Sequence, residues 1–320
     1  MMTKKVKKTV KINIEEIYNF LADELSGNQK RISINSILGV YYGISHDGFL
    51  RLSFMSVAPA PKIESTKFLR VTQGAESETV YWTCFDLLQN DAKKVFYTFC
   101  DNLIEAITDV LDEKNALQAL KKRYTTWKAM FRRERENKIS KEILQGLFGE
   151  LFFLKNYMLE NYDFQTAIQA WSGPDARSKD FAVYDEWYEI KTAGANATTV
   201  KISSLTQLSS SMPGHLVVVK VEAMSEQFDN GESCIGDLFK YILSRINDEA
   251  VEGIFLSKLS AYGFDASDES FTAKFDVKSM NLYKVGGDFP RLTEKDVTHT
   301  EICDVSYSLI INSLKPYLEG

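Results

Sequence analysis

Hydrophobic residues recur at helical spacing over several stretches in the first half of the chain. In one of them Ile14, Ile17, Leu21 and Leu25 share a helical face and precede a Ser-Gly stop. Helices are predicted over residues 14–25, 90–111, 116–135 and 140–159. Alternating runs predict strands over 31–42, 48–57, 67–72 and 78–85. This order indicates an α+β module at the N-terminus.

In the second half of the chain the pattern is dominated by strands. Residues 180–184 and 187–191 predict a β-hairpin whose two-residue turn is Asp185-Glu186. The apolar, β-branched run 215–222 is typical of a buried central strand. A short helix is predicted around Leu205, a longer one over 235–247, and further strands over 271–277, 280–285 and 305–311.

The predicted hairpin gathers charged side chains on one face. Asp180 lies opposite Lys191 in this register, and Ala182 lies opposite Glu189. Directly opposed residues point to the same side, as do residues two apart in a strand, so Asp180, Glu189 and Lys191 converge. The apolar residues of the hairpin point the other way, into a core: Phe181, Val183, Tyr188 and Ile190.

Two carboxylates beside a lysine are the residue types that a metal site for phosphodiester cleavage needs. Hard cations such as Mg²⁺ or Mn²⁺ take oxygen ligands, usually one or two carboxylates plus waters and phosphate oxygens. Asp180 and Glu189 would supply the carboxylates, and the backbone carbonyl of Ile190 a third ligand. Lys191 would orient the attacking water and stabilise developing negative charge. General-base use of a lysine first requires burial or a nearby cation to lower its pKa.

Glu150 is a further candidate because it lies inside an apolar helical run, Gln145-Gly-Leu-Phe-Gly-Glu150-Leu-Phe-Phe-Leu. A buried carboxylate is costly unless it is paired or bound to a cation. Glu150 would therefore bind a second metal or hold a water in the same site. The alternative is a buried ion-pair cluster with no catalytic role, which contributes little net stability.

The motifs in their order resemble the bacterial PD-(D/E)XK proteins of the restriction-endonuclease-like superfamily. The residues that carry the resemblance are Gly-Leu-Phe-Gly-Glu150-Leu, Trp171-x-Gly-Pro, Asp180-Phe, Glu189-Ile-Lys191-Thr, Val200-Lys-Ile-Ser-Ser-Leu-Thr-Gln207-Leu and Phe289-Pro-Arg-Leu292. The literal Pro-Asp pair is Pro174-Asp175, which precedes the hairpin. Asp180 is therefore favoured as the metal ligand, with Asp175 as the alternative.

The resemblance implies a fold and a function. The fold is an α/β (α+β) restriction-endonuclease-like core with a mixed central sheet flanked by helices. The function is a Mg²⁺- or Mn²⁺-dependent nuclease, acting on DNA more than RNA, in restriction or phage defence. Helicase-like and methyltransferase partners are part of that context, and a homodimer is left open. The alternative is a subunit that binds nucleic acid, or serves as a scaffold, without cleaving.

The net charge of −6 conceals a basic segment. From Lys121 to Lys141 nine basic residues stand against two acids, Glu134 and Glu136. We expect this surface to meet phosphates near the metal site, the alternative being a solvated helix face. Gln207 is expected to touch a phosphate or to position Lys191. The predicted nucleic-acid contacts are Lys128, Arg132, Arg133, Arg135 and Gln207.

Length and composition complete the expectations. The chain has 320 residues, 44% of them hydrophobic, which suits a globular protein of three parts: residues 1–115, 116–225 and 226–320. No apolar run is long enough for a membrane span, and residues 1–8 lack the apolar stretch of a signal peptide. The four cysteines are scattered without a CxxC pair, so structural zinc is not expected and a cytoplasmic location is.

Overall fold

The computed structural model describes residues 27–128, 139–174, 179–225, 234–264, 268–299, 301–302 and 304–319. The predicted helix over 14–25 lies outside these residues. The chain forms two compact units. Unit 1 comprises residues 1–132 and 266–268, and unit 2 comprises residues 133–265 and 269–320. This division differs from the three expected parts, because the helix that begins at Glu113 belongs to unit 1 and residues 269–320 belong to unit 2.

Unit 1 is an antiparallel sheet with a pair of packed helices. Within the described residues its strand order is β1-β2-β3-β5-β4. The strands are β1 (Gln29–Ile32), β2 (Gly39–Ile44), β3 (Leu50–Ser56), β4 (Leu69–Ser77) and β5 (Val80–Leu87). The helical elements are η1 (Asn90–Ala92), α2 (Lys93–Ile107) and α3 (Glu113–Trp127). Phe85, Phe99 and Tyr124 meet ring against ring and join the sheet to both helices.

Unit 2 contains the predicted mixed sheet, in the order β10-β9-β7-β6. Strands β7 and β9 are parallel, and the two outer pairs are antiparallel. The strands are β6 (Phe181–Val183), β7 (Glu186–Gly194), β9 (Gly214–Met224) and β10 (Lys274–Val285), and β8 (Thr199–Ile202) pairs separately with β11 (Tyr307–Ile310). The α/β fold class with a mixed sheet is thus confirmed.

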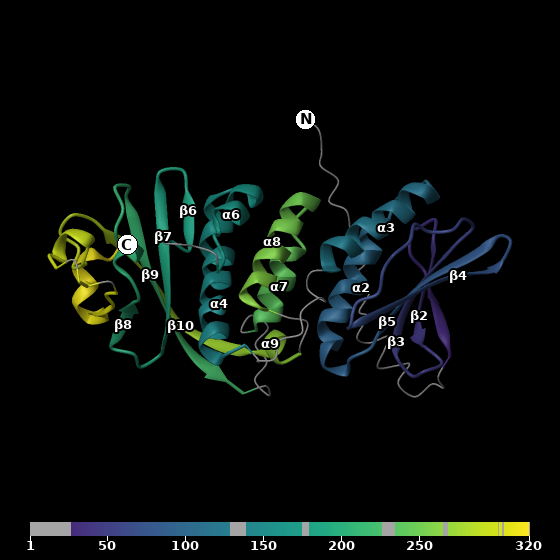
Figure 1. Ribbon diagram of the computed structural model, residues 1–320, viewed down its shortest axis with the longest axis horizontal. Helices are drawn as coiled ribbons and strands as arrows, with labels where there is room; N and C mark the ends of the chain where they lie inside the picture. Colours follow the sequence, from purple (N-terminus) through teal and green to yellow (C-terminus); the bar gives the residue numbers. More distant parts are fainter. Residues whose placement is uncertain are drawn as a thin grey trace. The chain divides into compact units, whose positions relative to one another are not determined.

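Helices of unit 2 cover one face of this sheet (Figure 1). They are α4 (Lys141–Phe153), the π-helical turn η3 (Leu154–Met158), α5 (Leu159–Asn161), α6 (Phe164–Ala170), α7 (Ile235–Leu243), α8 (Glu249–Tyr262) and α9 (Asp268–Thr272). The short 3₁₀ segments are η4 (Leu205–Gln207), η5 (Glu294–Asp296) and η6 (Ile311–Tyr317). None of the described helices is long and apolar enough to cross a membrane.

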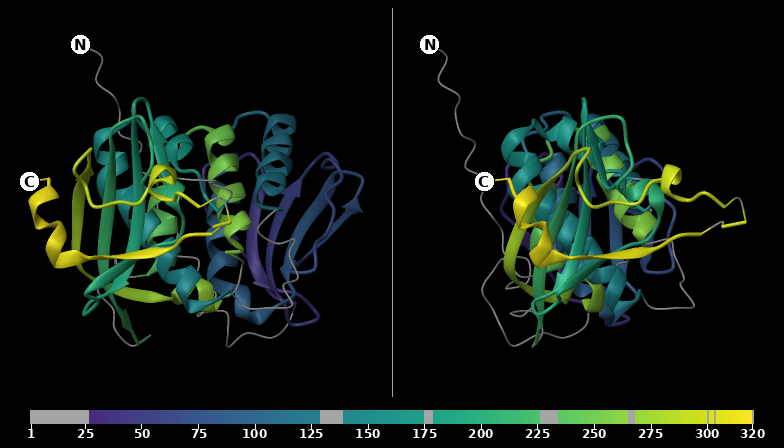
Figure 2. Two further views of the ribbon diagram at one scale, coloured as in Figure 1. Left: turned by 60° about the vertical axis from the view of Figure 1, so that its left-hand side comes forward. Right: turned by 90° about the vertical axis from the view of Figure 1, so that its left-hand side faces the viewer.

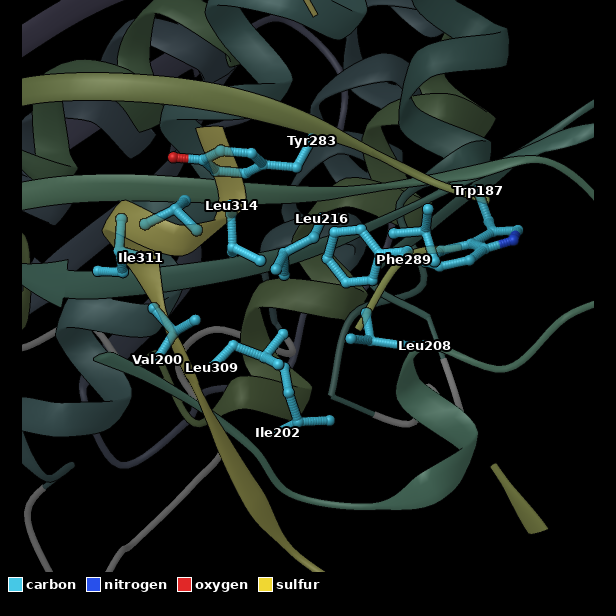
Figure 3. Close-up of a cluster of buried hydrophobic side chains, with 12 residues drawn as sticks. Trp187, Val200, Ile202, Leu208, Leu216, Tyr283, Phe289, Leu309, Ile311 and Leu314 are labelled. Atoms are coloured by element: carbon cyan, nitrogen blue, oxygen red, sulfur yellow. The ribbon is translucent and has the colours of Figure 1, made fainter. Parts of the chain in front are cut away.

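The second face of the sheet is covered by the C-terminal segment, which crosses in front of the strands in the right-hand view of Figure 2. The core between them is apolar and closely packed (Figure 3). Its members come from β7, β8, β9, β10, β11 and η6 and from the loops that follow η4 and β10: Trp187, Val200, Ile202, Leu208, Leu216, Val218, Tyr283, Val285, Phe289, Leu309, Ile311 and Leu314. This core packs against the face of β7 that carries residues 187, 189 and 191, and so holds the strand in place.

Most predicted elements are present, the short helices α6 and α9 were not predicted, and three longer segments differ from the prediction. The predicted strand 31–42 is two strands, because residues 33–38 turn between β1 and β2. The predicted strands 271–277 and 280–285 are one strand, β10, with an irregularity between Val277 and Ser279. Helix α8 was not predicted, although Asp248 caps its first turn and Gly263, at φ 81°, ends it in the left-handed conformation that glycine adopts readily.

Candidate active site

The hairpin of β6 and β7 keeps its predicted facing but not its predicted turn. Val183 pairs with Glu186, so the turn is Tyr184-Asp185 and the prediction of Asp185-Glu186 is wrong. Tyr184 takes the positive φ (49°) that tight hairpin turns require. The register is displaced by two residues, an even number, so each side chain stays on its predicted face. Phe181, Val183, Tyr188 and Ile190 are buried, as predicted.

Asp180 directly precedes Phe181, the first residue of β6, and its side chain reaches the backbone of β7. Its Oδ2 accepts a hydrogen bond from the backbone N–H of Ile190 at 2.7 Å, and its carbonyl accepts one from Ser172 N–H at 2.8 Å. The N–H and C=O of one strand residue point to the same side of the strand. The Ile190 carbonyl therefore points to the edge where Asp180 lies, as a third oxygen ligand would need.

Glu189 and Lys191 form an ion pair on the β7 face that packs against η4. Lys191 Nζ lies 2.8 Å from Glu189 Oε1 and 3.2 Å from Gln207 Oε1. Gln207 Oε1 also accepts from the Ser203 N–H at 2.7 Å, so its amide is fixed by the loop in which it lies. Gln207 therefore contacts Lys191, which is one of its two expected roles. Contact of Gln207 with nucleic acid stays a prediction.

Lys179 fixes the loop that carries Gln207. Its Nζ donates to the carbonyls of Thr206 and Gln207, both at 2.6 Å, and to that of Ser209 at 3.2 Å. The same ammonium lies 4.0 Å from the ring centroid of Trp187, and burial lowers the pKa of Lys179 to about 8. Lys179 therefore connects the start of the hairpin to the residue that contacts Lys191. Sequence reasoning missed this role because the partners are backbone carbonyls some 30 residues away.

Arg291 holds the same loop from a second side, since its Nη1 donates to the carbonyl of Leu208 at 2.7 Å. Trp187 Nε1 donates to the carbonyl of Met212 at 3.0 Å. Trp171 and Trp187 are both fully buried. Arg291 and Trp187 therefore fix the loop between η4 and β9, and neither buried tryptophan ring is exposed for stacking on a base.

Helix α4 approaches β7 closely because it carries Gly149. A Cβ built on Gly149 would lie 1.8 Å from Thr192 Oγ1, so a larger residue at 149 would push the helix off the strand. Gln145 Nε2 also donates to the Thr192 carbonyl at 3.1 Å. The Gln-x-x-x-Gly-Glu pattern is thus the docking surface of α4 on β7. This docking places the next residue, Glu150, near Asp180 and Glu189.

Glu150 is buried between two aromatic donors. Trp171 Nε1 donates to its Oε2 at 2.7 Å, and the Tyr262 hydroxyl lies 2.6 Å from Oε1 and 2.7 Å from Oε2. The two rings are stacked, with centroids 5.9 Å apart. Burial and then the charge of Asp180 raise the pKa of Glu150 to about 8, and Glu189 adds to the shift. Glu150 thus lies within electrostatic reach of the hairpin acids.

The three acids make the site strongly electronegative when all are ionised. Burial and then Asp180 raise the pKa of Glu189 to about 8, despite the opposing effect of Lys191. Burial also raises the pKa of Asp180 itself. The charge of Asp180 raises the pKa of both glutamates. Buried carboxylates that repel one another are stabilised by a cation, and perturbed pKa values of this kind mark functional sites.

The donor set fits a hard cation that keeps much of its water. In the described part of the chain, no three histidine, cysteine, aspartate or glutamate side chains form a ready-made metal cage. Mg²⁺ does not require one, because it binds through one or two carboxylates and retains several waters. Asp180, Glu189 and the Ile190 carbonyl suit this mode.

Several predicted residues fall outside the described part of the chain, namely Asp175, Arg132, Arg133 and Arg135. Asp175 therefore remains an untested alternative to Asp180. Lys128 is described, and its Nζ forms an ion pair with Glu64 Oε2 at 2.6 Å within unit 1.

Tyr262 is the site residue that sequence reasoning missed along with helix α8. The signals were present in the chain: an Asp248 cap, a Gly263 stop, and buried Val251, Phe255 and Leu259 at helical spacing. Nothing in the local sequence, however, connects Tyr262 with Glu150, which lies 112 positions earlier.

Comparison with known proteins gives one match. The profile of a family described as "Putative PD-(D/E)XK family member" matches residues 14–312. No curated protein matches the chain, and no solved structure does.

Proposed function

The chain belongs to this PD-(D/E)XK family, and from that premise we propose that it is a divalent-metal-dependent nuclease that hydrolyses phosphodiester bonds. The observation that carries the proposal is the grouping of two buried acids, Glu189 and Glu150, with the partly buried Asp180 at the edge of β7 and Lys191 beside Glu189. Packing alone gives no reason to bury carboxylates that raise one another's pKa.

Each residue of the site has a distinct role in the proposed reaction. Asp180, Glu189 and the carbonyl of Ile190 would hold Mg²⁺ or Mn²⁺. A cation bound there would lower the pKa of its water and neutralise charge on the phosphate. Lys191, held between Glu189 and Gln207, would orient the attacking water and donate to the phosphate oxygen on which charge develops.

Glu150 would act from the opposite side of the group. It does not hydrogen-bond to Lys191, and its two donors come from Trp171 and Tyr262. We propose that Glu150 receives a cation-bound water or a second cation on the side facing Asp180.

The substrate and the biological setting rest on the resemblance of the motifs to restriction-endonuclease-like proteins. We propose DNA as the substrate, and restriction or phage defence as the setting, with helicase-like or methyltransferase proteins as partners. The phosphate contacts would come from the basic segment that includes Arg132, Arg133 and Arg135.

The test is cleavage of supercoiled plasmid by the purified chain with Mg²⁺ or Mn²⁺. Asp180→Asn and Glu189→Gln each remove one charge and nearly preserve shape, so either should abolish cleavage, and Lys191→Ala should do the same. Asp185→Asn, in the exposed hairpin turn, is the matched control and should cleave as the parent chain does. Cleavage that survives in both acid variants, or in excess chelator, would place the nuclease elsewhere.

The second candidate is a non-cleaving nucleic-acid-binding subunit, and one observation keeps it open. Lys191 is tied to both Glu189 and Gln207, an arrangement that a purely structural ion pair would also show. Under this reading Asp180→Asn and Glu189→Gln would leave all measured functions unchanged. In the nuclease they would abolish cleavage and leave nucleic-acid binding similar or tighter, because repulsion between carboxylate and phosphate falls.

A further inference from the structure

Helix α8 reaches the site from a distant part of the chain through two residues one turn apart. Tyr262, its last residue, contacts both carboxylate oxygens of Glu150. Lys258, one turn earlier, donates to the carbonyls of Ile168 at 2.9 Å and Gln169 at 3.3 Å, and to that of Trp171. Lys258 therefore caps the C-terminal end of α6, where the last carbonyls have no partner in the helix.

Through these contacts, helix α8 holds both residues that donate hydrogen bonds to Glu150. Tyr262 belongs to the helix, and Trp171 is held at its backbone by Lys258 and at its ring by stacking on Tyr262. Packing of Trp171 on Phe255, a third α8 residue, completes the attachment at 5.9 Å between centroids. Glu150 itself enters from α4, so the carboxylate is fixed by elements that the sequence keeps far apart.

We propose that Trp171 and Tyr262 form a positioning clamp that fixes the Glu150 carboxylate for cation binding in the site. The inference deepens the proposed function, since it assigns how one of the cation-binding groups is held. The two residues are positioning residues and act through Glu150, without touching the substrate.

The clamp leaves acceptor capacity on Glu150. An ionised carboxylate offers about four lone-pair sites. Trp171 uses one on Oε2, and the single Tyr262 proton is shared between the two oxygens. At least one site therefore remains for a cation or its water. Because Trp171 and Tyr262 carry no charge, they hold the carboxylate in place without neutralising it, whereas an arginine or lysine would compete with the cation.

Removing a hydrogen-bond donor that orients a metal ligand typically weakens metal binding by about 10- to 100-fold. Tyr262→Phe deletes one hydroxyl and keeps the ring stacked on Trp171. Tyr241→Phe is the matched control, because the Tyr241 ring packs on Lys155 and Arg245 and takes no part in the clamp. The probe is Mn²⁺ alone, titrated into the full chain and followed by calorimetry and by the electron paramagnetic resonance of free Mn²⁺.

We expect Tyr262→Phe to weaken Mn²⁺ binding at least 10-fold, and Tyr241→Phe to change it less than 2-fold. In a Glu150→Gln background, Tyr262→Phe should cause no further loss, because the clamp acts only through that carboxylate. If Tyr262→Phe does not fold, Trp171→Phe removes the other donor and should produce the same loss. Unchanged Mn²⁺ binding in a folded clamp variant, or an equal loss in the Glu150→Gln background, would overturn the inference.

Failure of the proposed function gives a different result. A chain that binds Mn²⁺ at a Tyr262-dependent site but does not cut plasmid would retain the clamp and reject the nuclease. A parent chain that binds no Mn²⁺ would reject both.

Discussion

The raised pKa values of the site predict that, without metal, the folded chain loses stability as pH rises from 5.5 to 8. The pKa values of Glu150 and Glu189 rise from 4.5 to about 8 on folding. Between these values the folded state binds more protons than the unfolded state. The contribution of these two glutamates to the free energy of unfolding is therefore fully present below pH 4.5, and it is lost as pH rises through the folded pKa.

The expected magnitude follows from the size of the shift. At 1.36 kcal/mol per pKa unit, a rise from 4.5 to about 8 corresponds to about 5 kcal/mol. The two glutamates are coupled through Asp180 and titrate as a set, so we take about 5 kcal/mol for the whole group. About 3 kcal/mol of this falls between pH 5.5 and 8, which for 320 residues, at about 2.1 cal/mol/K of unfolding entropy per residue, is a fall in Tm of about 5 °C.

The pH window ends at 8 because two lysines reverse the trend above it. Burial lowers the pKa of Lys179 and of Lys258 to about 8. Above pH 8 the folded state therefore binds fewer protons at these lysines than the unfolded state, so their contribution to stability rises with pH. Calorimetric melts of the metal-free chain between pH 5.5 and 8 isolate the acids.

Two comparisons make the test specific to the site. The double variant Glu150→Gln, Glu189→Gln should lose most of the pH dependence, because neither amide titrates. Addition of 10 mM Mg²⁺, about the concentration needed for a weak site, should raise Tm more at pH 8 than at pH 5.5, since protons and the cation compete for the same oxygens. A metal-free Tm that is flat or rises between pH 5.5 and 8, or a double variant with the parent slope, would refute the reasoning.

Three further predictions follow from single contacts or from the basic segment. Gly149→Ala should destabilise the chain by about 1–3 kcal/mol in urea melts, because its Cβ meets Thr192 Oγ1, and Thr192→Ala in the same chain should recover part of the loss. Lys179→Met should lower kcat with little change in metal affinity, since it frees the loop that positions Gln207; equal losses in both would contradict a role through that loop. Replacing Arg132, Arg133 and Arg135 together should weaken binding to DNA of any sequence and reduce the slope of log K against log salt by up to about 3. An unchanged slope would mean that the basic segment is only a solvated surface.

The sequence alone determined the hairpin part of the site. Alternation in a strand has a period of two, so Asp180, Glu189 and Lys191 shared a face whichever even register the hairpin adopted. The predicted turn was wrong by one position on each strand, because Tyr184 takes a positive φ that its residue type does not favour. The residues on each face of the hairpin were nevertheless predicted correctly. Glu150 was also found from local pattern, because an acid within an apolar helical run needs a partner.

Tertiary structure alone decided what surrounds these residues. Tyr262 meets Glu150, Lys179 meets the carbonyls of Thr206 and Gln207, and Lys258 meets the end of α6. Such contacts join segments dozens of positions apart and depend on how α8 packs, which no local periodicity encodes. Backbone carbonyls are identical in every residue, so the sequence carries no signal for the lysines that bind them. The sequence therefore specified which charges share a strand face, and the packing of distant helices and loops decided how each charge is held.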